Sequence, residues 1–231
     1  MTETSKPPIR DPFELPDVSG LTIGVLGGTG EQGRGLALRW ARSGLSVIVG
    51  SRDPARARAA ASEIGIGVSG DGNAGCANSA DVAVVAVPWA GHEALLESLR
   101  GELATKIVVD CVNPLGSDKQ GSFALNVEQG SAAQQAASIL TESRVVAAFH
   151  HLSAVLLLDE SIEELDTDVL VLGDERAATD TVQALANRLP GVRGIFAGRL
   201  RNAHQIEALT ANLISVNRRY KCHAGIRLTH L

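Results

Sequence analysis

The chain has 231 residues, of which 20% are charged, and its formal net charge is -5 at pH 7. This balance gives no sign of a general nucleic-acid or membrane partner. No apolar run approaches the roughly 18 residues of a membrane span, and the N-terminus has no basic segment followed by an apolar stretch. Three widely separated cysteines, Cys76, Cys111 and Cys222, lack metal-ligand spacing. We therefore expect reduced thiols, no metal site and a cytoplasmic protein.

Residues 1–20 contain four prolines among charged residues and show no hydrophobic period. This pattern predicts a disordered or extended N-terminal segment. The ordered part of the chain is expected to begin near Leu21.

A glycine-rich turn lies between an apolar strand at residues 21–26 and a helical stretch at residues 34–42. Gly28, Gly30 and Gly33 fit the pattern G-x-G-x-x-G. The first glycine permits the turn, the second lets the backbone approach a pyrophosphate, and the third allows close packing of helix on strand. The helix N-terminus would then face the phosphates. In this context the motif predicts a dinucleotide site, the alternative being a tight structural turn.

The second strand, at residues 46–51, indicates which dinucleotide is bound. An NAD-binding domain places an acidic residue on the ribose about 20 residues after the glycines. Here that place is held by Ser51 and Arg52. A hydroxyl and a planar guanidinium suit a 2′-phosphate, and Arg56 adds a second positive charge. The pattern favours NADP over NAD, the alternative being a solvated loop.

Asp53 is the competing candidate for the ribose acid. We interpret it as a helix N-cap, because Pro54 follows at the favoured first helical position.

The rest of the chain alternates between apolar strands and helices, which predicts an α/β fold with a doubly wound, mostly parallel sheet of the Rossmann type. We expect an NADP-binding domain at residues 21–150 and a small C-terminal α/β lobe at residues 151–231. Residues 65–78 are expected to be a loop with at most one short strand. The further predicted strands are residues 82–87, 107–112, 145–149, 168–172 and 194–196, and the helices are residues 54–64, 91–99, 131–140, 177–189 and 202–220.

Ligands of open α/β sheets bind beyond the carboxyl ends of the strands, so the residues after each strand are candidate site residues. Adjacent histidines point to different sides of an extended chain, so at most one of the two here should face a ligand. The candidates are Pro88 and Trp89 after the strand at 82–87, Asn113, Pro114 and Leu115 after the strand at 107–112, and His150, His151 and Ser153 after the strand at 145–149.

Two of these candidates have a structural alternative. The indole of Trp89 either covers part of the cofactor or closes the edge of the core. His150 either contacts a ligand or is a loop histidine whose hydrogen bonds are satisfied within the protein.

Five segments of the chain are informative in combination. They are Gly-Gly-Thr-Gly-Glu-Gln-Gly-Arg-Gly-Leu-Ala-Leu-Arg at residues 27–39, Val-Gly-Ser-Arg at 49–52, Val-Pro-Trp at 87–89, Phe-His at 149–150 and Leu-Arg-Asn-Ala-His-Gln-Ile-Glu-Ala-Leu-Thr at 200–210. Together they resemble the NADPH-dependent coenzyme F420 reductases. The resemblance implies reversible hydride transfer between NADP and the 8-hydroxy-5-deazaflavin F420. By matching position it assigns NADP binding to Thr29, Gly30, Glu31, Gln32, Ser51, Arg52 and Arg56, with Pro88 and Trp89 along the path.

Hydride transfer between two carbon centres requires stacked rings rather than a protein nucleophile. The chain shows no nucleophilic triad spacing and no metal cluster, in agreement with that chemistry. Small and apolar groups at Pro114, Leu115, Ser153 and Ala154 could form the slot for the deazaflavin, with the C-terminal lobe contributing to it.

F420 also carries a phosphate and a glutamate tail, which require positive charge outside the slot. Four cations follow one another near the C-terminus: Arg218, Arg219, Lys221 and Arg227. They predict an exit for the anionic tail. The alternative is a cationic helix C-terminus that complements the helix dipole.

Two other functions remain open. One is an NADPH-dependent imine or carbonyl reductase, for which His150 and His151 are the only candidate proton donors. The other is a non-catalytic NADPH-binding sensor, since fold does not imply activity. The expected partners are small-molecule coenzymes, without nucleic acid or membrane. A homodimer is also open, because the apolar face of residues 202–220 could pack within the protomer or against a second one.

Overall fold

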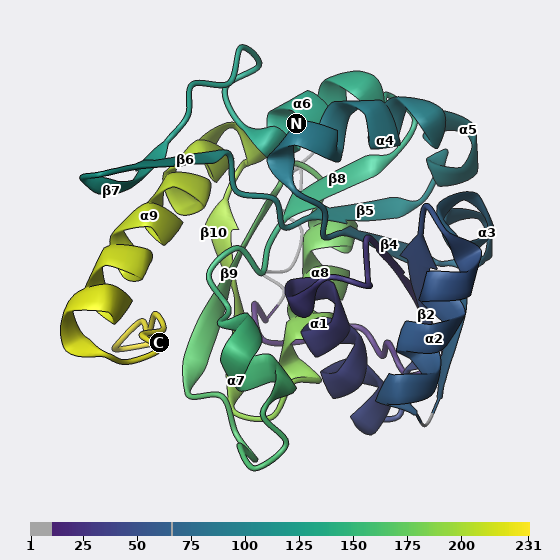
Figure 1. Ribbon diagram of the computed structural model, residues 1–231, viewed down its shortest axis with the longest axis horizontal. Helices are drawn as coiled ribbons and strands as arrows, with labels where there is room; N and C mark the ends of the chain where they lie inside the picture. Colours follow the sequence, from purple (N-terminus) through teal and green to yellow (C-terminus); the bar gives the residue numbers. More distant parts are fainter. Residues whose placement is uncertain (1–10, 66) are drawn as a thin grey trace, which may run out of the picture.

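The computed structural model describes residues 11–65 and 67–231, which contain an eight-stranded sheet with helices on both faces (Figure 1). The strand order is β10-β9-β8-β5-β4-β1-β2-β3, and every neighbouring pair is parallel except β8 and β9. This confirms the predicted doubly wound, mostly parallel α/β fold. The strands of the sheet are β1 (Thr22–Leu26), β2 (Ser46–Ser51), β3 (Val68–Gly72), β4 (Val82–Val85), β5 (Ile107–Asp110), β8 (Arg144–Ala147), β9 (Thr167–Gly173) and β10 (Val192–Gly198).

Helices cover the two faces of the sheet through separate apolar clusters. α1, α2 and α8 pack on one face, and α3, α4 and α6 pack on the other together with the start of α9. In the described residues, no helix is long and apolar enough to cross a membrane. The helices are α1 (Glu31–Arg42), α2 (Pro54–Ile64), α3 (Asn73–Ser79), α4 (His92–Ser98), α5 (Arg100–Leu103), α6 (Ala132–Ile139), α7 (Ala154–Leu158), α8 (Arg176–Asn187) and α9 (Ala203–Tyr220).

The chain reverses direction between β8 and β9. A β9 strand parallel to β8 would need a crossover connection that runs back along the length of the strands, usually as a helix. The connection between β8 and β9 contains only the five-residue helix α7. α7 is held against α1 by the buried side chain of Arg39, which donates hydrogen bonds to the carbonyl oxygens of Leu156, Leu157 and Asp159. The chain therefore re-enters the sheet from the carboxyl edge, and β9 runs antiparallel to β8.

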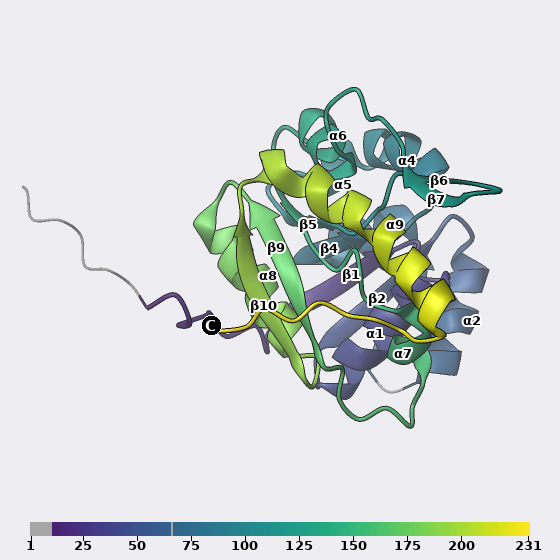
Figure 2. The same cartoon turned by 90° about the vertical axis from the view of Figure 1, so that its left-hand side faces the viewer.

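The sheet is continuous across the expected domain boundary at residue 150. β9 and β10 extend it beside β8, so the residues after 150 form no separate sheet. α9 runs along the flank of the molecule, and the C-terminal segment turns back beside it (Figure 2). The division into two domains at residue 150 stays a prediction.

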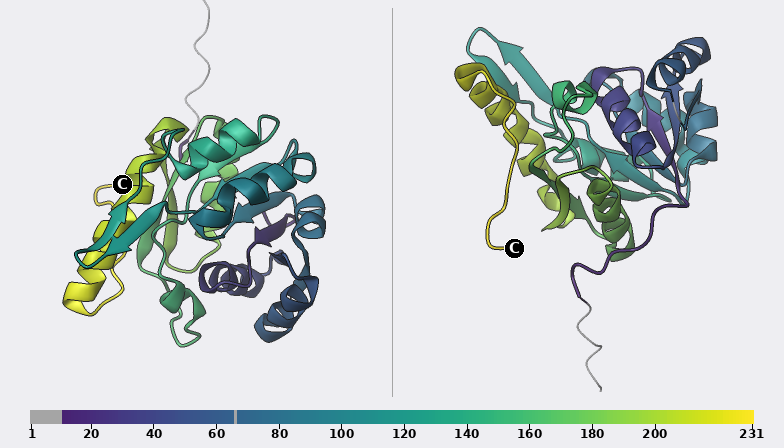
Figure 3. Two further views of the ribbon diagram at one scale, coloured as in Figure 1. Left: turned by 45° about the horizontal axis from the view of Figure 1, so that its top comes forward. Right: turned by 90° about the horizontal axis from the view of Figure 1, so that it is seen from below.

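The structure also contains elements that the sequence did not predict. Residues 65–78, expected to be a loop with at most one short strand, contain β3, which that prediction allowed, and most of the helix α3, which it did not. The edge strand β3 is polar, and a side chain at Gly70 would lie 2.3 Å from the carbonyl oxygen of Ala57. The others are α7 and a separate hairpin of β6 (Leu115–Asp118) and β7 (Gly121–Ala124), which lies beside α9 (Figures 1 and 3). The carboxylate of Asp118 stabilises the hairpin turn by accepting from the N–H groups of Gln120 and Gly121.

Part of the predicted N-terminal segment packs against the core. Residues 1–10 lie outside the described residues, and residues 11–20 form no helix or strand. The side chain of Val18 is nevertheless only 3% exposed and belongs to the cluster under α1 and α8.

The C-terminal segment is attached to the start of β9 through Asp168, whose side chain is fully buried. Arg193 donates to both carboxylate oxygens at 2.7 Å, and Arg227 and the N–H of Leu228 donate to the same group. Burial alone would raise the pKa of Asp168, but these donors outweigh it and hold the pKa at about 2.

We expect Asp168→Asn to lower the free energy of unfolding by about 2–4 kcal/mol at pH 7, because the arginines lose a buried charged partner. A depressed carboxyl pKa stabilises the fold above the unfolded pKa near 4. The difference from the wild type should therefore shrink as the pH falls from 4 toward 2. Urea denaturation measures this, with the exposed Asp166→Asn as control. Equal effects of the two substitutions would contradict the assignment.

Candidate coenzyme site

The glycine turn after β1 combines tight packing with an open backbone. The positive φ of the turn, 75°, falls at Gly27 rather than at Gly28. A side chain at Gly28 would lie 2.8 Å from the carbonyl oxygen of Val25, and one at Gly33 would lie 2.7 Å from the Cα atom of Gly28. At Gly30 the nearest atom would be 3.6 Å away. The first and third positions are therefore filled by protein, and the middle one leaves room for a ligand.

α1 begins directly after this turn, at Glu31 rather than at the expected residue 34. Its N-cap, Gly30, offers no side-chain hydrogen bond to the first turn. The free N–H groups of a helix N-terminus attract anions. Glu31 and Gln32 lie in this first turn, and the Gln32 side chain donates to the carbonyl oxygen of Phe149 at 3.3 Å.

A cavity of about 700 Å³ opens between the glycine turn and the ends of β2 and β4. It brings together residues that the sequence analysis assigned to one coenzyme. Its lining comprises Gly27, Thr29, Gly30, Ser51, Arg52, Asp53, Arg56, Asn73, Ala86, Val87, Pro88, Ala90, Gly91 and Leu95.

Two guanidinium groups in this lining are available to an anion. Arg52 and Arg56 are exposed, and within residues 11–65 and 67–231 neither forms an ion pair. The carboxylate of Asp53 accepts from the N–H groups of Ala55 and Arg56, so its interpretation as the N-cap of α2 is confirmed. Two unpaired arginines beside the hydroxyl of Ser51 fit the 2′-phosphate of NADP.

Asn73 is a further lining residue that the sequence analysis missed, because it starts the unexpected helix α3. Its Oδ1 atom is buried and has no hydrogen-bond partner in the described part of the protein. Such a group normally finds a partner, so a ligand donor would fit here. The only sequence signal was an asparagine within a glycine-rich stretch.

Pro88 lines the cavity, whereas Trp89 does not. The indole of Trp89 packs against the second apolar cluster, and its centroid lies 5.4 Å from that of the His92 ring. This placement favours the alternative in which Trp89 closes the edge of the core.

Hydrogen bonds join the corners after β5 and β8 to α9. The side-chain N–H of Asn113 donates to the carbonyl oxygen of His150 at 2.8 Å, and Thr210 donates to the same oxygen and to Oδ1 of Asn113 at 3.3 Å. Phe149 takes a positive φ of 64°, which is unusual for a bulky residue and turns the chain sharply before His150. Pro114 and Leu115 follow Asn113 and lead into the β6–β7 hairpin.

The imidazole of His150 is only 4% exposed, and neither ring nitrogen has a hydrogen-bond partner among the described residues. Burial lowers the pKa of His150 to about 4. The ring is therefore neutral near pH 7, with one N–H donor and one acceptor free. His151 instead hydrogen bonds through Nε2 to the backbone oxygen of Asp168.

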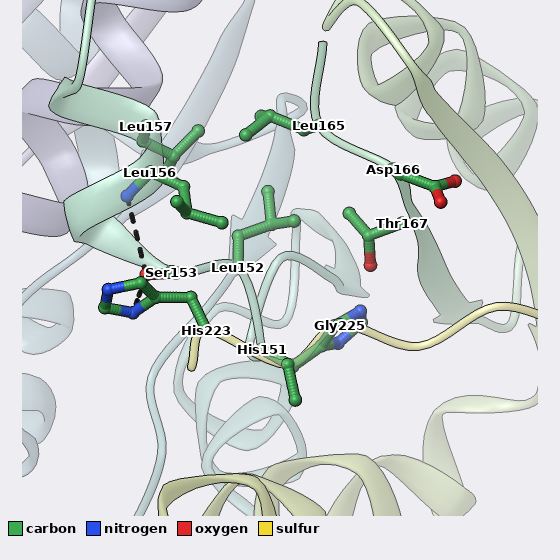
Figure 4. A pocket seen from close by; sticks show the side chains of 11 residues that line it. His151, Leu152, Ser153, Leu156, Leu157, Leu165, Asp166, Thr167, His223 and Gly225 are labelled. Atoms are coloured by element: carbon green, nitrogen blue, oxygen red, sulfur yellow. Dashed lines mark hydrogen bonds between the residues drawn. The ribbon is translucent and has the colours of Figure 1, made fainter. Parts of the chain in front are cut away.

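Ser153 belongs to a different and much smaller cavity, of about 40 Å³. Figure 4 shows its hydroxyl beside the ring of His223 from the C-terminal segment, at 3.2 Å. The hydroxyl also accepts from the N–H of Leu156 and so caps α7. Ser153 does not line the coenzyme cavity.

A buried polar cluster behind the β5 corner was not expected from the sequence. His92 contacts Asp110 through Nε2 at 2.6 Å and Gln135 through Nδ1 at 2.8 Å. Glu207 on α9 accepts from the N–H groups of Ala132 and Ala133 at the start of α6. All four side chains are at least 93% buried. A charged residue ending the apolar strand Ile-Val-Val-Asp was the one local signal.

All four cations near the C-terminus are exposed. Arg218 and Arg219 line a groove of about 600 Å³ between α9 and the β6–β7 hairpin. Arg227 instead pairs with Asp166 and Asp168 and does not line this groove.

These features define a dinucleotide-binding α/β protein whose site suits NADP. The chain matches the family described as NADP oxidoreductase coenzyme F420-dependent over residues 22–114. It is 43% identical to the F420-dependent NADP reductase of Methanothermobacter thermautotrophicus, over 91% of this chain and 96% of the relative. It is 37% identical to the F420-dependent NADP reductase of Methanocaldococcus jannaschii, over 91% of this chain and 99% of that relative. The chain belongs to the F420-dependent NADP reductase family.

The fold agrees with that assignment. The crystal structure of a putative F420-dependent NADP-reductase from Arthrobacter sp. FB24 superposes with a TM-score of 0.80 at 28% identity. The match covers 91% of this chain and all of the other.

Proposed function

We propose that this protein transfers a hydride reversibly between NADPH and coenzyme F420. The observation that carries the proposal is the coenzyme cavity, in which the glycine turn, Ser51, Arg52 and Arg56 share one lining. Family membership supplies the second coenzyme, since the curated relatives are F420-dependent NADP reductases.

Each part of the site has a role in that reaction. The first turn of α1 binds the pyrophosphate, and Arg52 and Arg56 bind the 2′-phosphate. The corner of Asn113, Pro114 and Leu115 lies beside the nicotinamide. The bound coenzymes supply the chemistry, a hydride passing between two ring carbons, and the protein must hold these carbons about 3–3.5 Å apart.

The assay that tests this proposal follows the absorbance of oxidised F420 with NADPH or NADH supplied in turn to the purified protein. We expect bleaching with NADPH and at least about tenfold slower bleaching with NADH, because only NADPH uses the arginines. Equal rates would keep the reaction but refute the phosphate role of Ser51 and Arg52. No bleaching with either would refute the reaction itself.

The environment of the two histidines supports this function over a carbonyl reductase. A reductase of that type needs a proton donor near the transferred hydride. His150 is neutral near pH 7 and His151 is held by a backbone oxygen. Turnover of an imine or a small carbonyl compound in place of F420 would reverse this preference, and tight NADPH binding without any turnover would indicate a sensor.

We propose further that the groove beside Arg218 and Arg219 binds the anionic tail of F420. Thr210, Ile214 and Arg218 follow one another at four-residue intervals and so share one face of α9. This face leads from the hydrogen bond to Asn113 out to the groove. Ser117 and Ser122 offer hydroxyl donors in the same lining, and Asp118 is the one acidic residue among its described members.

The double substitution Arg218→Ala, Arg219→Ala should raise the KM for F420 about 10-fold, because two charged donors to the tail are lost. The kcat and the KM for NADPH should change less than about twofold. Steady-state kinetics measures this, with Arg100→Ala on α5 as control. Unchanged KM for F420 would mean that the two arginines only complement the helix dipole.

We also propose that the enzyme works in the cytoplasm on small-molecule coenzymes alone. Light scattering would decide whether it forms a homodimer, for which the exposed Ile214, Val216 and Tyr220 on α9 offer an apolar surface.

A further inference from the structure

The buried cluster of His92, Asp110, Gln135 and Glu207 joins α4, β5, α6 and α9, and the proposed reaction does not use it directly. We propose that His92 is a positioning residue, which as a doubly protonated imidazolium fixes the β5 corner beside the expected nicotinamide. This inference rests on the proposed function.

The hydrogen-bond partners of His92 are both acceptors. Nε2 lies 2.6 Å from the carboxylate of Asp110, and Nδ1 lies 2.8 Å from Oε1 of Gln135. The amide group of Gln135 is oriented by its own donation to Oε1 of Gln129 at 3.4 Å. A neutral imidazole carries one N–H and would leave one of these acceptors unpaired, whereas an imidazolium satisfies both.

The charges around the ring support this protonation state. Asp110 faces His92 from β5, Gln135 from α6 and Glu207 from α9. Burial alone would lower the pKa of His92, but the Asp110 carboxylate and the Gln135 amide outweigh it and raise the pKa above its ordinary value. Burial also raises the pKa of Glu207 to about 7, so this second acid is partly neutral near physiological pH.

The cluster reaches the corner through Asp110. One carboxylate oxygen contacts His92, and the other accepts from the N–H of Val112 at 3.0 Å. The next residue, Asn113, binds the backbone of His150. Asp110 thus fixes one side of the corner and Asn113 the other.

His92 also connects this corner to the segment that lines the coenzyme cavity. It is the first residue of α4, directly after Gly91, and Trp89 packs on its ring. Gly91 and Pro88 line the coenzyme cavity. Buried ion pairs add little net stability compared with apolar packing, whereas they restrict geometry where both partners are held. The cluster therefore sets the position of the β5 corner relative to the coenzyme cavity.

Histidine-labelled protein without coenzyme gives the first test, because it requires no variant and no activity. We expect NMR to show both ring N–H groups of His92 at pH 7, with the ring losing its second proton only when the pH is raised further. A neutral ring with a single N–H at pH 7 would overturn the proposal.

The second test is His92→Gln, with the exposed His204→Gln on α9 as control. We expect kcat for F420 reduction to fall about 10- to 100-fold while the dissociation constant of NADPH changes less than threefold, because misplaced rings slow transfer without releasing the phosphates. Equal kcat in His92→Gln and the wild type would also overturn the proposed positioning role of His92.

If His92→Gln does not fold, the pH profile of the wild type replaces it. The kcat should fall as the pH rises through the midpoint measured by NMR. A kcat that does not change across this midpoint would refute the positioning role. Failure of the wild type to reduce F420 at any pH would instead refute the proposed function, leaving the NMR result on His92 to stand by itself.

Discussion

Replacing Arg52 by alanine is expected to raise the dissociation constant of NADPH about 10- to 100-fold and to leave that of NADH within about twofold. A charge-assisted hydrogen bond to phosphate contributes about 1.5–3 kcal/mol to binding. NADH has no 2′-phosphate, so its binding does not depend on this bond. Arg52 carries this effect because it lines the cavity and forms no ion pair among the described residues. Isothermal titration with both nucleotides measures it.

Arg58→Ala is the matched control. Arg58 lies on α2, the helix that follows the loop of Arg52, and is also exposed, but it does not line the cavity. The control should bind both nucleotides like the wild type. A loss of affinity that is equal for NADPH and NADH in Arg52→Ala would show that the arginine acts on the fold of the loop and not on the phosphate.

The second large effect is expected from Gly30→Ala, which should weaken NADPH binding at least about 10-fold while keeping the melting temperature within about 2 °C. Gly30 has an extended backbone, with φ -80° and ψ 163°, that alanine also adopts. Its added methyl group would touch no protein atom closer than 3.6 Å. The methyl group would occupy the space through which a pyrophosphate approaches the backbone.

Two other glycines give the comparison. At Gly33 a Cβ atom would lie 2.7 Å from the Cα atom of Gly28, so Gly33→Ala should lower stability and binding together. Gly101 has no atom within 4 Å of the added group, and Gly101→Ala should leave binding unchanged. Tight NADPH binding by Gly30→Ala would contradict the placement of the pyrophosphate.

The sequence predicted the parts of the site that depend on local pattern. The glycine turn, Ser51, Arg52 and the N-cap role of Asp53 each follow from a few adjacent residues. The structure places Gly30, Ser51, Arg52 and Arg56 around one cavity. Their roles toward NADP stay predictions until binding is measured.

The missed parts depend on contacts between distant segments. Asn73 reaches the cavity only because a polar edge strand leads into α3. His92 and Asp110 are 18 residues apart, and His92 and Gln135 are 43 apart. No hydrophobic period or spacing rule links such positions, since they meet only when β5, α4 and α6 pack together. The reversal at β9 was missed for a related reason, because the hydrogen bonds of Arg39 that hold α7 span more than 100 residues.

Direct hydride transfer between the two coenzymes is tested by NADPH carrying deuterium at C4 of the nicotinamide, with mass spectrometry of the reduced F420. The proposed function predicts that deuterium from one face of the ring appears in reduced F420, in ordinary water, without exchange. Reduced F420 that carries hydrogen from the solvent, or no reduction at all, would contradict it.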